Sequence, residues 1–147
     1  MDEFSEKIAN KFRSQFPRWI SYCGAVNRDG AVIFEAKIPF PGSKRDAFLT
    51  LATDNQEVTV YLDSYHAHFD DFGENNSNSD ALVFVQKIIS NEYVVVSYWR
   101  DSQWCGSEHV PINALPTGNE EYPYANLVKM YSWLGNYDNE IHYKPRG

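Results

Sequence analysis

The sequence predicts an α+β fold, with a mainly antiparallel sheet of about six to eight strands, an N-terminal helix and one middle helix. Three features predict it. Apolar residues recur at every fourth position near the start of the chain, alternating segments are joined by tight turns, and a broad apolar stripe lies near the middle. The chain has 147 residues, 43% of them hydrophobic, which is enough for a single domain covering residues 1–147.

An amphipathic helix is predicted from Asp2 to Phe16. Its large apolar residues are spaced four apart, so they fall on one face of a helix. Acidic residues occupy the first turn, where the helix dipole favours them, and Pro17 ends the helix. The apolar stripe consists of Phe4, Ile8, Phe12 and Phe16.

Antiparallel hairpins are expected to follow this helix. The Asp-Gly pair within residues 27–30 favours a tight turn between two strands, and residues 53–56 form the next turn. After these strands, residues 65–71 are expected to form a His-rich, acidic elbow. The predicted strands are Trp19–Val26, Ala31–Phe40, Asp46–Ala52 and Glu57–Asp63.

The second half of the chain combines a helix with further strands. Ser79 or Asp80 can cap a helix that runs to about Ser90, although its β-branched residues leave a strand as an alternative. An irregular loop with three prolines is expected over residues 111–123. The predicted strands are Tyr93–Trp99, Trp104–Val110, Ala125–Trp133 and Glu140–Tyr143.

The composition disfavours several classes of function. A net charge of −7 repels phosphate, so direct binding to nucleic acid or to an anionic membrane is not expected. The sequence contains no run long enough to span a membrane and does not begin like a signal peptide. We therefore expect a cytoplasmic protein in which Cys23 and Cys105 are reduced thiols outside any CxxC pair.

Negative charge is concentrated in two stretches. Residues 46–86 and residues 101–128 contain acidic side chains and no Lys or Arg. If the two stretches meet in the fold, they form a surface that attracts a basic partner. The alternative is an ordinary solvated surface without a partner.

The motif with the most specific chemistry is His66-Ala-His68-Phe-Asp70-Asp71. On a strand, His66 and His68 lie on one face, and imidazole with carboxylate suits zinc or iron. The motif partly resembles the HxHxDH box of the metallo-β-lactamase superfamily, with Asp71 in the place of the last His. This resemblance implies, as an alternative function, a small metal-dependent hydrolase using His66, His68 and Asp70.

Two other interpretations of these histidines need no metal. The rings can be exposed or hydrogen-bonded at the end of a strand, or they can contact a protein partner. In the second case, protonation near pH 6.5 weakens binding to a basic partner. The remaining histidines, His109 and His142, lack the context of further ligands. No metal or cofactor is therefore expected.

The sequence gives no indication of a nucleophile or a phosphate-binding loop. Neither cysteine has a recognisable base beside it, and Ser107 and His109 lie outside any nucleophile elbow. No GxGxxG or GxxxxGKS motif occurs. We expect a protein that is not an enzyme and has no catalytic residues.

Residues 57–138 resemble the small cytoplasmic immunity proteins of bacterial polymorphic toxin systems, including those of contact-dependent growth inhibition. Such a protein binds one cognate toxin domain, often a nuclease, and covers its active site or substrate surface. The resemblance therefore implies a basic protein partner, because a nuclease must hold nucleic acid. It rests on Tyr65–Asp71, on Ala81 and Phe84 in the middle helix, on Val94–Arg100 and on Lys129–Asp138.

The charge pattern, and not the resemblance, supplies the candidate contact residues. Aromatic residues are added because they anchor many protein interfaces. The acidic and histidine candidates are Asp63, His66, His68, Asp70, Asp71, Glu74, Asp101, Glu108, Glu120 and Glu121. The aromatic candidates are Tyr65, Trp104 and Tyr122.

Overall fold

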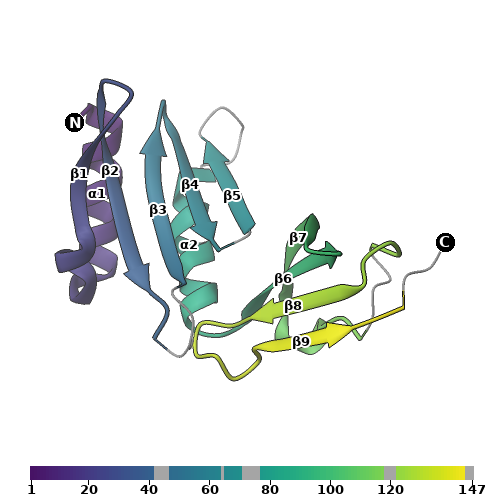
Figure 1. The fold of residues 1–147 in the computed structure, drawn as a ribbon. Coiled ribbons are helices and arrows are strands. Elements are labelled where there is room, and N and C mark those ends of the chain that lie inside the picture. Colours follow the sequence, from purple (N-terminus) through teal and green to yellow (C-terminus); the bar gives the residue numbers. More distant parts are fainter. Residues whose placement is uncertain (42–46, 64, 71–76, 118–121, 145–147) are drawn as a thin grey trace. The chain divides into compact units, whose positions relative to one another are not determined.

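The computed structural model describes residues 1–41, 47–63, 65–70, 77–117 and 122–144. Over these residues the fold contains two α-helices, two short 3-10 helices and nine strands in two antiparallel sheets (Figure 1). The predicted α+β class is confirmed, and the strands divide between two sheets where one was expected.

The chain divides into two compact units, which are described separately. Unit 1 comprises Met1–Pro39 and Ala47–Val85, and unit 2 comprises Phe40–Asp46 and Gln86–Gly147. None of the described helices is long and apolar enough to cross a membrane.

Unit 1 contains the first sheet, in which five described strands follow the order β1-β2-β3-β4-β5. Each strand runs antiparallel to the next, as expected for successive hairpins. The helices α1 and α2 lie on one face of this sheet (Figure 1). The elements are α1 (Glu3–Gln15), η1 (Pro17–Tyr22), β1 (Cys23–Arg28), β2 (Ala31–Pro39), β3 (Phe48–Asp54), β4 (Glu57–Leu62), β5 (Tyr65–Asp70) and α2 (Ser77–Ile89), whose last four residues belong to unit 2.

Two predicted segments of unit 1 differ from the structure. The strand expected from Trp19 begins as the 3-10 helix η1, because Pro17 favours a helical start and the Trp19 ring stacks 4.9 Å from that of Phe16. The expected elbow at residues 65–70 is the edge strand β5, paired with β4 along its whole length. The tight turn before β5 starts at Asp63, whose φ is 54°.

The sheet of unit 1 is apolar on its helix-covered face. Alternate residues of β2, β3 and β4 are buried there, as period-2 alternation requires. The Phe12 ring of α1 packs 5.8 Å from that of Phe34 in β2. A buried hydrogen bond of 2.6 Å joins Ser5 Oγ to Thr53 Oγ1, which also accepts the backbone N–H of Phe34. Helix α1 is thus attached to the sheet by packing and by a satisfied polar bridge.

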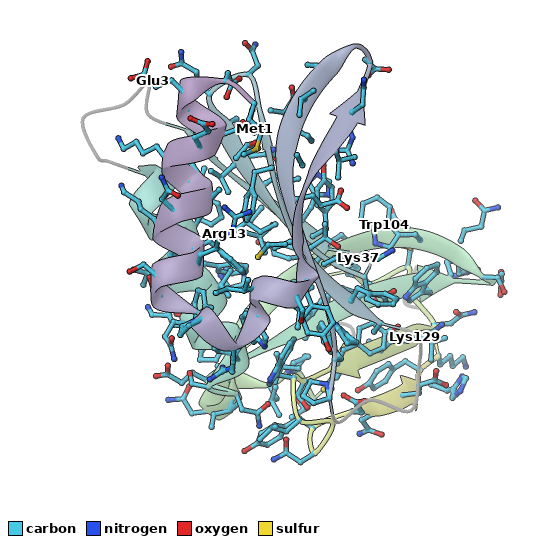
Figure 2. All side chains as sticks on the ribbon, turned by 90° about the vertical axis from the view of Figure 1, so that its left-hand side faces the viewer. Met1, Glu3, Arg13, Lys37, Trp104 and Lys129 are labelled. Atoms are coloured by element: carbon cyan, nitrogen blue, oxygen red, sulfur yellow. The ribbon has the colours of Figure 1, made fainter. Side chains whose placement is uncertain are left out.

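The start of α1 is capped by Asp2. Its carboxylate accepts the backbone N–H of Ser5 at 2.7 Å, which lowers the pKa of the Asp2 carboxyl. Glu3 lies in the first turn of this helix and Arg13 in its last turn, where their charges complement the helix dipole; Figure 2 labels both.

We expect Asp2→Ala to destabilise the protein by about 1 kcal/mol, because the Ser5 N–H loses its acceptor. The folded-state pKa of Asp2 is lowered, so the stabilisation is complete above the ordinary carboxyl pKa and is lost as the pH falls through the lowered value. Urea unfolding at neutral and at acidic pH measures both effects. Asp2→Asn keeps an acceptor and is the control; equal losses for the two variants would contradict a capping role.

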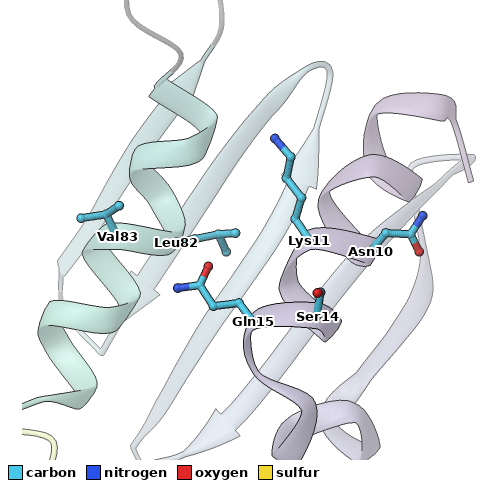
Figure 3. Close-up of a pocket in the computed structure, with 6 residues that line it drawn as sticks. All are labelled: Asn10, Lys11, Ser14, Gln15, Leu82 and Val83. Carbon is cyan, nitrogen blue, oxygen red and sulfur yellow. The ribbon is translucent and has the colours of Figure 1, made fainter.

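A groove of about 560 Å³ lies between α1 and α2 on unit 1 (Figure 3). Three of its six lining residues are polar and uncharged, Lys11 is the charged member, and the exposed Val83 lies at its α2 side. None of the lining residues that the structure describes carries a carboxylate, imidazole or thiol, and Lys11 supplies a titratable amine. The lining residues are Asn10, Lys11, Ser14, Gln15, Leu82 and Val83.

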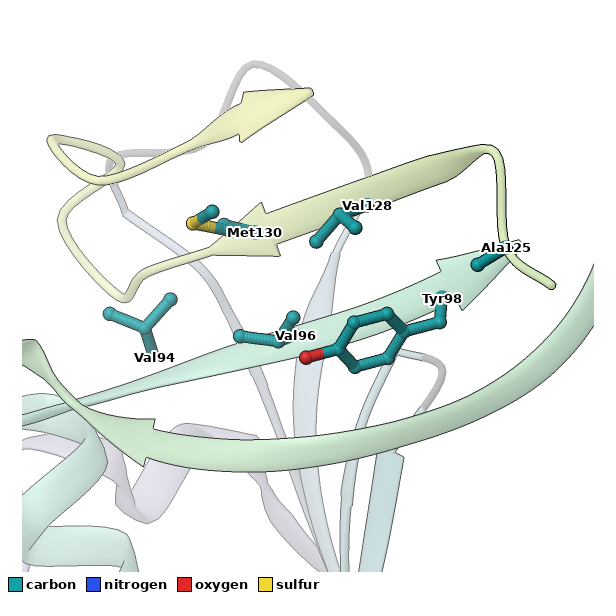
Figure 4. Close-up of a cluster of buried hydrophobic side chains, with 6 residues drawn as sticks. All are labelled: Val94, Val96, Tyr98, Ala125, Val128 and Met130. Atoms are coloured by element: carbon teal, nitrogen blue, oxygen red, sulfur yellow. The ribbon is translucent and has the colours of Figure 1, made fainter. Parts of the chain in front are cut away.

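Unit 2 contains the second sheet, in which four described strands follow the order β7-β6-β8-β9. The apolar strand β6 is an interior strand, as its nearly continuous apolar sequence predicts. Its buried side chains form a cluster with those of β8 and with Ala125 (Figure 4). The elements are β6 (Tyr93–Arg100), β7 (Gln103–Pro111), η2 (Ile112–Ala114), β8 (Leu127–Tyr131) and β9 (Asn139–His142).

A β-bulge interrupts the β6–β7 pairing. Tyr98 pairs with Gly106 and Trp99 pairs with Trp104, so Cys105 is an extra residue on β7. The turn joining these strands has positive φ at Asp101 and Ser102, which suits a two-residue hairpin. The bulge brings Gly106 under the ring of Tyr122, close enough that a Cβ at this position would lie 2.3 Å from the Tyr122 hydroxyl.

Candidate partner-binding surface

The β4–β5 hairpin places two of the predicted unit 1 candidates, His66 and His68, on one face. Tyr61 lies opposite His66, and Thr59 lies opposite His68. Because directly opposed residues of an antiparallel pair project to the same side, these four side chains are neighbours. This is the face turned away from the helices, since the alternate residues of β4 are buried beneath them.

His68 is held by its neighbours on β4. Its Nδ1 lies 3.0 Å from Thr59 Oγ1 and contacts the carboxylate of Glu57, forming an ion pair when His68 is protonated. The His68 side chain is nevertheless 53% exposed. The His66 ring packs edge-on against it at 4.9 Å and lies 5.9 Å from the Tyr61 ring. The two histidines therefore form an exposed, partly ordered polar and aromatic patch.

Tyr65 lies on the opposite side of β5. Its ring is 6.5 Å from Phe84 of α2, and the Phe69 ring is 5.7 Å from the same side chain. Tyr65 is half-buried and packs toward the helix. The structure thus separates Tyr65 from His66 and His68, with which the sequence grouped it.

The acidic candidates of unit 1 flank this patch in the chain. Asp63 is exposed in the turn that precedes β5, and Asp70 is the last residue of β5. The pairing places Asp70 opposite Glu57, although the Asp70 side chain is outside the described part of the structure. Asp71 and Glu74 lie outside the described residues altogether.

The metal-site hypothesis requires His66, His68 and a carboxylate to converge. The two histidines share a face and lie close together, as the motif predicts. Nδ1 of His68 is directed toward Glu57 and Thr59. Among the side chains that the structure describes, no group of three or more His, Cys, Asp or Glu is arranged to hold a metal ion.

In unit 2, Trp104 is the most exposed of the predicted aromatic candidates. Its side chain is 56% exposed, and its Nε1–H donates to Ser107 Oγ at 2.8 Å. Trp104 lies opposite Trp99, and the Lys129 Nζ is 4.8 Å from the Trp99 ring. Figure 2 labels Trp104 and Lys129. Asp101 is also exposed, with a carboxylate that accepts from Asn126 Nδ2 at 2.8 Å.

Two other unit 2 candidates take part in packing. The hydroxyl of the fully buried Tyr98 donates to Glu108 at 2.9 Å, so this carboxylate satisfies a buried polar group. The Tyr122 ring lies 4.6 Å from the Tyr98 ring and covers Gly106. Glu120 and Glu121 lie outside the described residues.

Two partly buried titratable groups, Cys23 and His109, lie outside both patches. Burial raises the pKa of the Cys23 thiol, whose Sγ donates to the backbone carbonyl of Trp19 at 3.4 Å. Burial lowers the pKa of His109, whose ring meets that of Tyr93 edge-on at 5.2 Å. At neutral pH the structure therefore favours a protonated thiol and an uncharged imidazole at these positions.

The unit 1 patch also contains residues that the sequence reading did not select. Glu57, Thr59 and Tyr61 belong to it only because β4 pairs with β5 in this register. Strand alternation could have grouped these three with one another, but it could not have placed them beside the histidines. The patches containing His68 and Trp104 belong to different units, and each is described by itself.

Comparison with known proteins gives no family for this chain. No protein-family model, curated protein or solved structure matches it. The charge, exposure and strand arrangement of the chain are therefore the features that bear on its function.

Proposed function

We propose that this protein is an immunity protein that binds a cognate toxin domain, most simply a basic nuclease, and covers its active site or substrate surface. The main supporting observation is the absence of Lys and Arg from residues 46–86, the stretch that forms β3, β4 and β5. A nuclease surface must be basic to hold nucleic acid, so it is complementary to such a stretch.

Exposed aromatic and imidazole groups support a protein partner. Tyr61 is 39% exposed beside His66 and His68, and Trp104 is exposed on unit 2. Large rings of this kind supply buried contact area when a partner covers them. The acidic charge supplies long-range attraction, and the rings supply short-range contacts.

The direct test is co-purification of the tagged full chain with the protein encoded immediately upstream. The partner is then assayed for RNA and DNA cleavage with and without the chain, and the complex is measured at several salt concentrations. A complex that silences cleavage and forms more slowly at high salt is the expected result. An inert neighbour that forms no complex would overturn the proposal.

Neutralising Asp54 and Asp63 tests the electrostatic part of the proposal. Both are exposed at strand ends within residues 46–86, the stretch that contains no Lys or Arg. Asparagine tolerates the positive φ of Asp63. We expect Asp54→Asn/Asp63→Asn to slow association with the toxin roughly three- to tenfold at low salt, because long-range attraction is weakened. The difference should diminish at high salt in stopped-flow measurements.

The matched control is Glu3→Gln/Glu6→Gln, which changes the net charge equally but lies in the first turn of α1. A smaller effect from this control would locate the attraction at β3, β4 and β5, the strands without Lys or Arg. Equal slowing by both pairs would show that only the net charge matters, and no slowing by either would contradict electrostatic steering.

A further inference from the structure

Strand β5 lies at the end of its sheet. Among the described strands it pairs with β4 alone. An edge strand carries a row of backbone N–H and C=O groups that are directed away from the sheet. Such a row can bind an extended segment of another chain by adding a strand to the sheet.

The turn register determines which backbone groups face outward. Leu62 and Tyr65 flank a two-residue turn, so their backbone groups bond to each other across the hairpin. Alternation along β5 then directs the backbone groups of Ala67 and Phe69 toward β4. The backbone groups of His66, His68 and Asp70 therefore point away from β4.

The pairing on the other side of β4 agrees with this assignment. Asp54 and Glu57 flank the β3–β4 turn, so the backbone groups of Glu57 and every second residue after it are directed toward β3. The intervening residues Val58, Val60 and Leu62 are left to bond with β5. Both hairpins thus assign outward-pointing backbone groups to the same residues of β5, namely His66, His68 and Asp70.

Within the described residues of β5, several features that commonly protect an edge strand are missing. Its six residues include no proline, Lys or Arg, and its pairing with β4 contains no register shift. The other edge strands carry such features. β1 contains Arg28, β7 has a bulge and ends in Pro111, and β9 has four residues.

We propose that the outer edge of β5 binds an extended, basic segment of the partner as an added antiparallel or parallel strand. This inference rests on the proposed function and specifies how the partner docks. Pairing at His66 and His68 supplies about four backbone hydrogen bonds. The neighbouring carboxylate of Glu57 and the absence of Lys and Arg from residues 46–86 favour a basic segment.

The charge also argues against a second copy of this chain as the occupant. Pairing β5 with β5 would bring together two copies that each carry a net charge of −7. Like charges across an interface weaken association. A basic segment experiences attraction at the same edge.

Replacing His68 with proline tests whether its outward backbone N–H binds the partner, separately from the folding of the sheet. The His68 N–H points outward, so His68→Pro removes no backbone bond to β4 but takes away a donor that the added strand needs. We expect this variant to bind the toxin about tenfold to 100-fold more weakly with little loss of stability. His68→Thr removes the same imidazole, keeps the N–H and should bind more tightly than the proline variant.

Ala67→Pro is the folding control. The Ala67 N–H points toward β4, so this variant loses a bond within the sheet and should unfold at lower urea concentration. Equal binding by His68→Pro and His68→Thr would overturn the proposal, because the outward N–H would then have no role.

Amide hydrogen exchange of the full chain tests the edge without mutation. The probes are the toxin domain and a short peptide that alternates lysine with valine; a glutamate–valine peptide is the control. We expect the toxin and the basic peptide to slow exchange at His66 and His68. Toxin neutralisation with unchanged exchange at both residues would overturn the edge proposal and leave the proposed function standing.

Two further outcomes distinguish the proposals. If the toxin does not bind but the basic peptide protects His66 and His68, the proposed function fails and the edge proposal stands. Protection that instead increases with the concentration of the chain alone, together with dimers in sedimentation, would assign the edge to a second copy and overturn the basic-partner proposal.

Discussion

Replacing Phe12 with alanine is expected to destabilise the protein by about 3–5 kcal/mol. The Phe12 side chain is fully buried, and its ring lies 5.1 Å from Phe16, 5.8 Å from Phe34 and 6.1 Å from Trp19. Alanine removes the apolar contacts of the Phe12 ring with Phe16, Trp19 and Phe34. It leaves a cavity among these three aromatic side chains. Urea unfolding followed by circular dichroism measures the loss.

Ser14→Ala is the matched control on the same helix. Ser14 is exposed, so its replacement should change the free energy of unfolding by less than about 0.5 kcal/mol. Phe12→Leu retains much of the apolar volume and should fall between the two. A loss below about 1 kcal/mol for Phe12→Ala would contradict the central position of this ring in unit 1.

Replacing Gly106 with alanine is expected to cost about 1–3 kcal/mol, because a Cβ would overlap the Tyr122 ring. The distances from this Cβ would be 2.3 Å to the hydroxyl oxygen and 2.4 Å to Cζ. Tyr122 cannot move away without losing its contact with Tyr98, whose ring lies 4.6 Å from it. The urea midpoint of the full chain reports the cost.

Gly24→Ala provides a control in another strand. A Cβ at Gly24 would meet no atom within 4 Å, so this variant should be close to neutral. In a Tyr122→Ala background, the cost of Gly106→Ala should largely disappear, because the overlapping ring is absent. An unchanged cost in that background would show that the strain lies elsewhere.

The candidate surface shows where sequence reasoning succeeds and where it stops. Alternation correctly places His66 and His68 on one face of a strand. The sequence also identifies Trp104 as an aromatic candidate, and its side chain is exposed to solvent in the structure. By contrast, charge and ring type predict Glu108 and Tyr122 as contact residues, whereas in the fold the Glu108 carboxylate accepts from the Tyr98 hydroxyl and the Tyr122 ring packs against the Tyr98 ring.

The sequence by itself determined the features that depend on neighbouring residues. The four-residue spacing of apolar side chains predicts α1, and the Asp29-Gly30 pair predicts the first hairpin, whose two turn residues have φ of 53° and 86°. The apolar run of β6 likewise predicts an interior strand. Periodicity and turn chemistry act over a few residues, so they can be read along the chain.

Only the tertiary structure decided how the strands are shared between two sheets and which strand is left at an edge. Alternation is the same for a strand in either sheet, whereas pairing depends on contacts between segments distant in sequence. The register of β5 against β4 places His68 beside Glu57 and turns its N–H outward. The edge on which the docking proposal depends is therefore a product of strand pairing.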